Sequence, residues 1–306
     1  MNKSVLAIIG TLVLAGCVGQ TGTVTSATGA GLAITSFAPD VASQFDEKPV
    51  RILLDVENQG EATIGIETSQ VYLNGPIGTG ALDWKLASEE TQGRKFKRDL
   101  NPANPAEERP AGVDSLKWTL TAPSLAAGQT RTDTFTARTY YDYRTEAVGT
   151  VPAYSEAESI AAREAKQELA KSSFIVSKGP LTLEIRIIPD PVVVTDNKEV
   201  VTIDVKVTNS GGGTVYKAGA VSGDLTKAPS LAASDLNKVK MKIDAGSLVL
   251  SGACDEEQEL IAGKPTSLTC DYDVPKPDTS KSYPIKVTLN YGYYIDASTQ
   301  VEVVGR

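Results

Sequence analysis

The chain has 306 residues, a formal net charge of −8 and no histidine, and its length is enough for two domains of ordinary size. An acidic chain is repelled by nucleic-acid phosphates and by anionic lipid head groups, so neither is expected as a partner. Without histidine there is no Ser-His-Asp or Cys-His nucleophile and no histidine-rich metal cage. We therefore expect a chain that is not an enzyme, needs no cofactor and holds no metal.

Residues 1–17 have the outline of a secretory signal, because Lys3 precedes a short apolar run, Val5–Ala15. This run is shorter than the roughly 20 apolar residues of a membrane span. The end of the run, Leu14-Ala15-Gly16-Cys17, resembles the lipobox of lipoproteins, whose cysteine takes a diacylglyceryl group and becomes the first residue of the mature chain. The resemblance implies a lipid anchor on Cys17 and a place in the cell envelope, facing outside the cytoplasm. An uncleaved hydrophobic anchor is the alternative, and it gives nearly the same topology.

Setting Cys17 aside for lipid leaves two cysteines, Cys254 and Cys270. In an oxidising compartment we expect them to form a disulfide. A bridge across a loop of this length is worth about 3 kcal/mol in the chain-entropy model. The acidic residues after Cys254 do not make a zinc site, because the chain has no histidine and no further thiol.

The rest of the chain divides by composition into four segments. Residues 18–31 are mostly Gly, Thr, Ser and Ala, which predicts a flexible tether. Residues 32–153 carry short alternating runs rich in Val, Ile, Thr and Tyr between Gly, Pro and Asn turns, the pattern of a β-sandwich. Residues 154–173 are strong helix formers with a capping box and predict a helical linker, and the strand pattern returns over 174–306. The predicted fold is all-β, with two tandem sandwich domains joined by one α-helix.

The second half of the chain repeats the first. Val50–Ile64 lies over Val201–Val215 without a gap at an offset of 151 residues. Each copy is an alternating strand, then Asn, a Gly-containing turn and a second strand that begins Thr-Ile or Thr-Val. This run resembles the immunoglobulin-like modules of prokaryotic envelope proteins, in particular CARDB-type domains and duplicated archaeal surface domains. The resemblance implies two immunoglobulin-like sandwiches with an adhesive or architectural role, and it transfers no catalytic residue.

A tyrosine cluster lies near the end of each copy. The offset of 151 places Tyr140 on Tyr291 and Tyr143 on Tyr294. This recurrence favours a structural role, in which the hydroxyls of late-strand tyrosines bond back to the main chain.

Three aromatic residues fall outside the repeat. Tyr141 and Tyr293 have no counterpart in it, and Trp84 precedes a charged, proline-rich loop over residues 85–110. These three are candidates for an exposed aromatic patch, which could stack on sugar rings or hold a partner. Trp118 lies within an alternating apolar strand and is expected in the core instead.

Taken together, these features favour a lipid-anchored surface protein that serves as a non-catalytic adhesion, scaffold or assembly module. Its expected contacts are the membrane, through the N-terminal lipid, and other envelope or surface proteins. The alternative is a solute- or glycan-binding receptor lipoprotein, and a deep pocket lined by Trp84, Tyr141 or Tyr293 would favour it. A third reading is a subunit of a surface filament, whose exposed strand edges would pair between chains.

Overall fold

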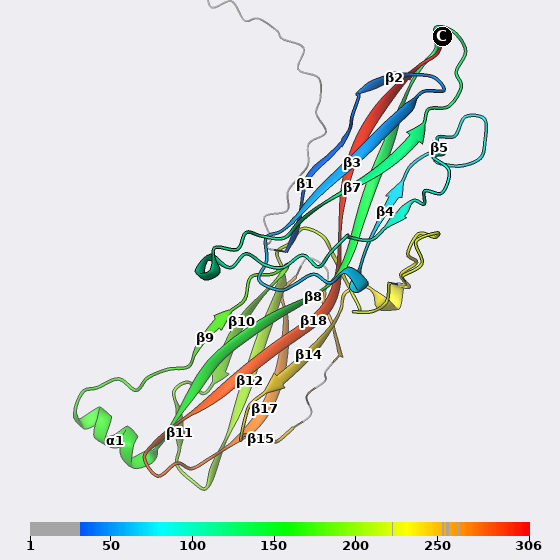
Figure 1. The fold of residues 1–306 in the computed structure, drawn as a ribbon. Helices are drawn as coiled ribbons and strands as arrows, with labels where there is room; N and C mark the ends of the chain where they lie inside the picture. The colour runs from blue at the N-terminus through cyan, green and yellow to red at the C-terminus, as the bar shows by residue number, and fades with distance from the viewer. Residues whose placement is uncertain (1–30, 222, 253, 255–256, 262–263) are drawn as a thin grey trace, which may run out of the picture.

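Two long antiparallel strands run the whole length of the molecule (Figure 1). They are β8 (Thr130–Ser155) and β18 (Ser280–Val304), and they pair without a break over 25 residue positions. At about 3.4 Å per residue, a strand of this length spans about 85 Å. The pair therefore forms the axis along which the other strands are arranged.

The computed structural model describes residues 31–306 except 222, 253, 255–256 and 262–263. The leader, the lipidation candidate Cys17 and residues 18–30 of the predicted tether lie outside the described residues. The described residues form two four-stranded sheets and one ten-stranded sheet. This arrangement confirms the predicted all-β sandwich fold.

Unit 1 is the sandwich built around the N-terminal half of β8 and the C-terminal half of β18. One layer has the strand order β1-β3-β7-β5, with β1 (Leu32–Pro39), β3 (Pro49–Asn58), β7 (Val113–Thr121) and β5 (Lys85–Leu86). The facing layer belongs to the ten-stranded sheet and adds β4 (Ser69–Asn74), β6 (Gly93–Arg94) and β2 (Ser43–Phe45). Along β3, Val50, Ile52, Leu54 and Val56 are buried, as the alternating sequence predicts.

Unit 2 is built around the other halves of the same two strands. One layer has the order β10-β12-β17-β15, with β10 (Leu181–Ile188), β12 (Lys198–Asn209), β17 (Thr266–Pro275) and β15 (Val249–Leu250). The facing layer adds β14 (Lys238–Asp244), β16 (Glu257–Glu259), β9 (Ser173–Val176), β11 (Val192–Val194) and β13 (Thr214–Tyr216). Three short 3-10 turns complete the described elements, at Ile66–Thr68, Pro105–Glu107 and Ala233–Asp235.

The two units are not separate modules in space. Unit 1 needs the C-terminal half of β18, and unit 2 needs the C-terminal half of β8. One continuous cluster of buried apolar residues accordingly runs through both units. The predicted boundaries at residues 153 and 174 divide the chain, whereas each sandwich takes strands from both segments.

The predicted helix forms, but it is shorter than expected and does not lie between the units. Helix α1 covers Glu156–Glu164, and Ser155 caps it by accepting a hydrogen bond from the amide of Glu158 at 3.2 Å. Figure 1 shows the helix at the far tip of unit 2, beside β11. It is therefore part of the connection by which the chain turns back from the end of β8 toward the middle of the molecule.

A pseudo-two-fold axis relates the two units and passes through the middle of the long strands. Asp142 pairs with Gly292 at this point, so residue i of β8 corresponds to residue i+150 of β18. A shift of 151 would turn every side chain to the opposite face of the sheet, because side chains alternate along a strand. Tyr141 therefore corresponds to Tyr291, and Tyr143 to Tyr293. The offset of 151 remains correct for the earlier turns, where Asn58 and Asn209 each accept a hydrogen bond from the amide two residues later.

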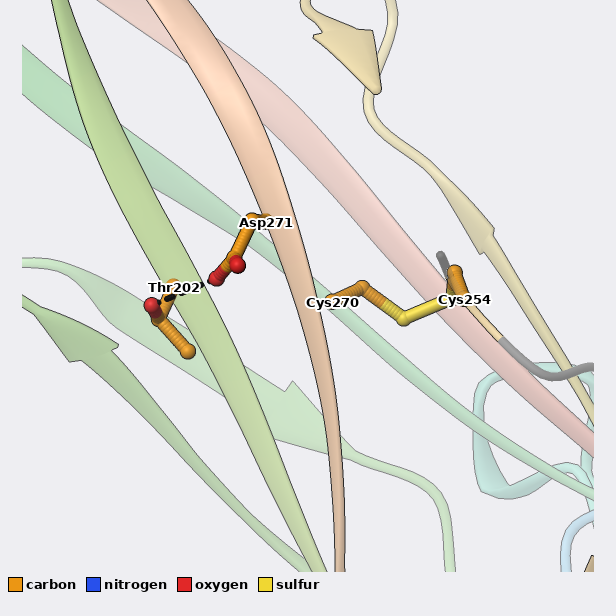
Figure 2. The surroundings of a disulfide bond; sticks show 4 residues. All are labelled: Thr202, Cys254, Cys270 and Asp271. Carbon is orange, nitrogen blue, oxygen red and sulfur yellow. Dashed lines mark hydrogen bonds between the residues drawn. A yellow bond between two sulfur atoms is a disulfide. The ribbon is translucent and has the colours of Figure 1, made fainter. Parts of the chain in front are cut away.

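The predicted disulfide between Cys254 and Cys270 is confirmed (Figure 2). The two Cα atoms are 5.0 Å apart, and Cys270 points into the core from β17. Cys270 lies opposite Ile203 of β12 as Trp118 lies opposite Ile52 of β3. The disulfide thus occupies in unit 2 the core position that Trp118 fills, fully buried as predicted, in unit 1.

We expect the Cys254→Ser/Cys270→Ser variant to lose about 3 kcal/mol of unfolding free energy. Because β8 and β18 belong to both units, the loss in unit 2 should also destabilise unit 1. The two tryptophans of the chain, Trp84 and Trp118, both lie in unit 1, so their fluorescence reports that unit alone. In urea unfolding, the fluorescence midpoint should fall together with the midpoint of the circular dichroism signal. If the urea midpoint measured by tryptophan fluorescence stays at the wild-type value, the two units do not depend on each other through β8 and β18.

Candidate functional site

The three residues proposed as an exposed aromatic patch are all buried, so that prediction is wrong. Trp84 is 0% exposed, and Tyr141 and Tyr293 are each 1% exposed. The indole Nε1 of Trp84 donates to Asp133 Oδ2 at 2.7 Å, and its ring meets Phe135 edge-on at 5.3 Å. The odd-numbered residues in the middle of β8 and β18 face the interior. The offset of 151 aligns odd residues of β8 with even residues of β18, so it does not show that Tyr141 and Tyr293 share this inward face.

The waist, where the two units meet on the long strands, is filled by four buried tyrosines. Tyr141, Tyr143, Tyr291 and Tyr293 form a ring-to-ring layer with centroid distances of 5.9 to 6.4 Å. Such spacings are typical of favourable edge-on and tilted aromatic contacts. The layer joins the cores of the two units without leaving a hinge between them.

Each of these hydroxyls bonds to the main chain or to a turn. Tyr141 and Tyr291 accept hydrogen bonds from the amides of Leu32 and Leu181, the first residues of β1 and β10, both at 3.3 Å. Tyr143 accepts from the amides of Glu61 and Ala62 and donates to the carbonyl of Lys178, at 3.0, 3.1 and 2.9 Å. Tyr293 accepts from the Gly213 amide at 2.7 Å and donates to Asn209 Oδ1 at 2.8 Å. The structural role predicted from the repeat is thus present for Tyr143 and Tyr291 and extends to Tyr141 and Tyr293. Tyr140 and Tyr294, for which it is also predicted, belong instead to a separate cluster.

A second, smaller apolar cluster covers the outer face of the sheet at the waist. It consists of Tyr72, Tyr140 and Tyr216. Packed against it are Tyr294 and four residues of the loop between β13 and β14, which are Ala220, Val221, Leu231 and Leu236. The Tyr216 ring lies directly on the backbone at Gly292, where a Cβ atom would come within 2.0 Å of it, so only glycine fits there.

Three hydrogen bonds fasten this loop of unit 2 to strands of unit 1. The Gly219 amide donates to the carboxylate of Asp142 at 3.1 Å, Gln70 Nε2 donates to the carbonyl of Asp224 at 3.0 Å, and the Gly93 amide donates to the carbonyl of Leu225 at 3.1 Å. Burial raises the pKa of Asp142, and the Gly219 amide opposes that rise by bonding to the ionised form.

Beside this loop lies a polar pocket of about 430 Å³. Its charged lining residues are Glu61, Asp142, Arg144 and Glu146, and the others are Ala62, Thr63, Thr68, Tyr143, Ser177, Ala218 and Asn290. Sequence reasoning missed this site, because its residues come from several separate segments. The nearest signal is the charged pair Asp142 and Arg144 on either side of Tyr143.

Among the described residues, no group of three or more His, Cys, Asp or Glu side chains is placed to hold a metal ion. No helix in the described part of the chain is long and apolar enough to cross a membrane.

Burial raises the pKa of the waist tyrosines, that of Tyr293 to about 12. An unfolded tyrosine ionises near pH 10, so above this pH the unfolded state gives up protons that the folded state keeps. Stability should therefore be unaffected below pH 10 and should fall as the pH rises beyond it. In an alkaline titration, the phenolate absorbance of the waist residues should appear only with loss of near-ultraviolet circular dichroism. Complete tyrosine ionisation in a protein that keeps its native dichroism would contradict the buried layer.

No family model and no curated protein matches the sequence. Among solved structures, the chain is similar to the D0-D1 domain of intimin at 12% identity, with a TM-score of 0.21 over 89% of this chain and 98% of that one. It is similar to the secreted serine protease VesC from Vibrio cholerae at 6% identity, with a TM-score of 0.21 over 87% of this chain and 50% of that one. It is also similar to the Enterococcus faecalis MSCRAMM ACE, whose structure is titled as binding its ligands by the collagen hug model, at 7% identity and a TM-score of 0.15 over 89% and 95% of the two chains. At such TM-scores the function has to be argued from the chain's own residues.

Proposed function

We propose that this protein is a lipid-anchored, extracytoplasmic surface module that serves adhesion, scaffolding or assembly without catalysis. The observation that carries the proposal is the unbroken pairing of β8 with β18 through both units. A rod whose two sandwiches share their central strands and one continuous core resists bending at the waist. Such a body is suited to holding surfaces at a set distance from each other.

The chain enters this rod at its middle. Gly31 lies against Pro180 and Tyr141, and the next amide, that of Leu32, bonds to the Tyr141 hydroxyl. The segment that leads from the lipidation candidate Cys17 therefore joins the rod beside the pseudo-two-fold axis. A lipid on Cys17 would hold the rod by its waist and leave both tips free to meet other surface components.

The receptor alternative depended on exposed aromatic side chains. Trp84, Tyr141 and Tyr293 are instead buried, and their polar atoms are already bonded within the fold. The pocket at the waist is lined mainly by polar residues rather than by stacking platforms. These observations favour protein partners over sugars.

The Cys17→Ser variant tests the anchor. Since lipid attachment needs the thiol, we expect the variant to lose lipid labelling and either to appear in the medium or to keep its leader. The matched control is Cys254→Ser, which removes a thiol from the disulfide and should keep its lipid label. Metabolic labelling with a fatty acid, followed by fractionation of the cells, measures both. Undiminished labelling of Cys17→Ser would refute lipidation at this residue.

Crosslinking on intact cells tests the assembly role. We expect amine-reactive crosslinkers to join the protein to other envelope or surface proteins, which mass spectrometry would identify. The control is the same reaction after the cells have been disrupted and diluted, where these products should disappear. Recovery of the protein alone, with a bound sugar or free peptide, would favour the receptor and contradict the scaffold.

A further inference from the structure

The central strand β8 has a free edge at the waist. On the side away from β18, β8 pairs with β4 as far as Tyr141 and with β9 from Ala147 onward, and no described strand lies between. Glu146 and Ser177 exchange hydrogen bonds across this side, through the Ser177 amide and the Ser177 hydroxyl. Because such groups alternate along an antiparallel strand, the main-chain N–H and C=O groups of Asp142 and Arg144 also face the gap.

The other unit has a strand at the equivalent place. There β13, Thr214–Tyr216, pairs with Gly292–Tyr294 of β18, which correspond by the pseudo-two-fold axis to residues 142–144 of β8. The position is therefore one that this fold can fill with a short antiparallel strand.

The charged loop of unit 1, residues 85–110, explains why the gap stays open there. By the sequence repeat, Ile64 corresponds to Val215 of β13. Ile64 pairs instead with Leu100 of this loop, through two main-chain hydrogen bonds of 3.1 and 2.9 Å, and both side chains are fully buried. The loop thus holds this segment away from β8, and the pocket of about 430 Å³ lies beside the free edge.

The pocket is negatively charged. Its lining carries three carboxylates, Glu61, Asp142 and Glu146, against one guanidinium, Arg144. Glu146 Oε1 is 3.2 Å from Arg144 Nε and 2.9 Å from Lys286 Nζ. Glu61 accepts a hydrogen bond from the Lys178 amide at 3.1 Å, and among the described residues no cationic side chain forms an ion pair with it. A positively charged side chain is therefore the complement that this edge lacks.

We propose that the waist pocket docks an extended segment of a partner protein, which adds to β8 as an antiparallel strand opposite residues 142–144 and places a lysine or arginine beside Glu61. Main-chain hydrogen bonds to Asp142 and Arg144 hold the strand, and the pocket selects its side chain, as in other cases of strand addition. This inference rests on the proposed assembly function and states where the partner attaches and with what chemistry.

Binding of a labelled probe to the purified protein tests the site apart from its cellular role. The probe is acetyl-Thr-Val-Lys-Val-Thr-amide, and the matched control replaces its Lys with Glu. We expect the lysine peptide to bind saturably and to protect the amides of Asp142 and Arg144 from hydrogen exchange. Its binding affinity should fall as salt is added. The glutamate peptide should bind at least about tenfold more weakly. Equal binding of both peptides, or binding without protection of these amides, would overturn the proposal.

Two variants locate the binding on the protein. Glu61→Gln keeps an acceptor for the Lys178 amide but removes the negative charge. It should lower the affinity for the lysine peptide by about three- to tenfold. Ala218→Trp places a bulky ring at the exposed rim and should abolish binding. The control is Glu67→Gln, a charge removed outside the pocket, which should leave binding unchanged. If both pocket variants bind the lysine peptide with wild-type affinity, the site is rejected. If a variant does not fold, the hydrogen-exchange protection of Asp142 and Arg144 in the wild-type protein still tests the site. Probe binding without envelope crosslinks would refute the cellular role alone.

Discussion

The antiparallel pairing of β8 with β18 sets where the other strands can lie. Each strand is long enough to serve two sandwiches, so neither unit closes its core without residues from both halves of the chain. The pairing also contains the pseudo-two-fold axis where Asp142 lies opposite Gly292, and a slip of one residue would turn the inward face of one long strand outward. A duplicated module has in this way become a single rod rather than two domains connected by a linker.

At the waist, side chains have to fill the space between the two sandwich cores and also bond the main-chain groups of nearby strand ends and turns. A junction between two sandwiches would ordinarily leave the ends of strands and turns to water. Here tyrosines fill the junction with their rings, and their hydroxyls accept hydrogen bonds from the amides that open β1 and β10 and from amides of the turns that follow β3 and β12. Tyrosine suits this place, since it combines a large apolar body with a polar tip that must find a partner when buried.

The two units differ in their loops, and the differences are concentrated at the waist. In unit 2, residues of the loop between β13 and β14 lie over the outer tyrosines, and hydrogen bonds join this loop to strands of unit 1. In unit 1, Leu100 of the charged loop pairs with Ile64, and the edge of β8 beside it is open. The pseudo-symmetric scaffold thus carries one covered edge and one open, acidic edge, and this asymmetry is the feature on which the proposed docking site depends.

The sequence by itself determined the all-β fold, the duplication, the capped helix and the pairing of Cys254 with Cys270, because alternation, turn residues and cysteine count are local or countable signals. Only the tertiary structure decided the rest. The sharing of β8 and β18 depends on pairing between residues about 150 positions apart, which no local pattern records. The burial of Trp84, Tyr141 and Tyr293 depends on which face of the sheet meets the opposite layer, and a repeat misaligned by one residue reverses that face. The pocket lies where Ile64 pairs with Leu100 rather than with β8, and no local sequence pattern tells which of two possible strand partners a residue takes.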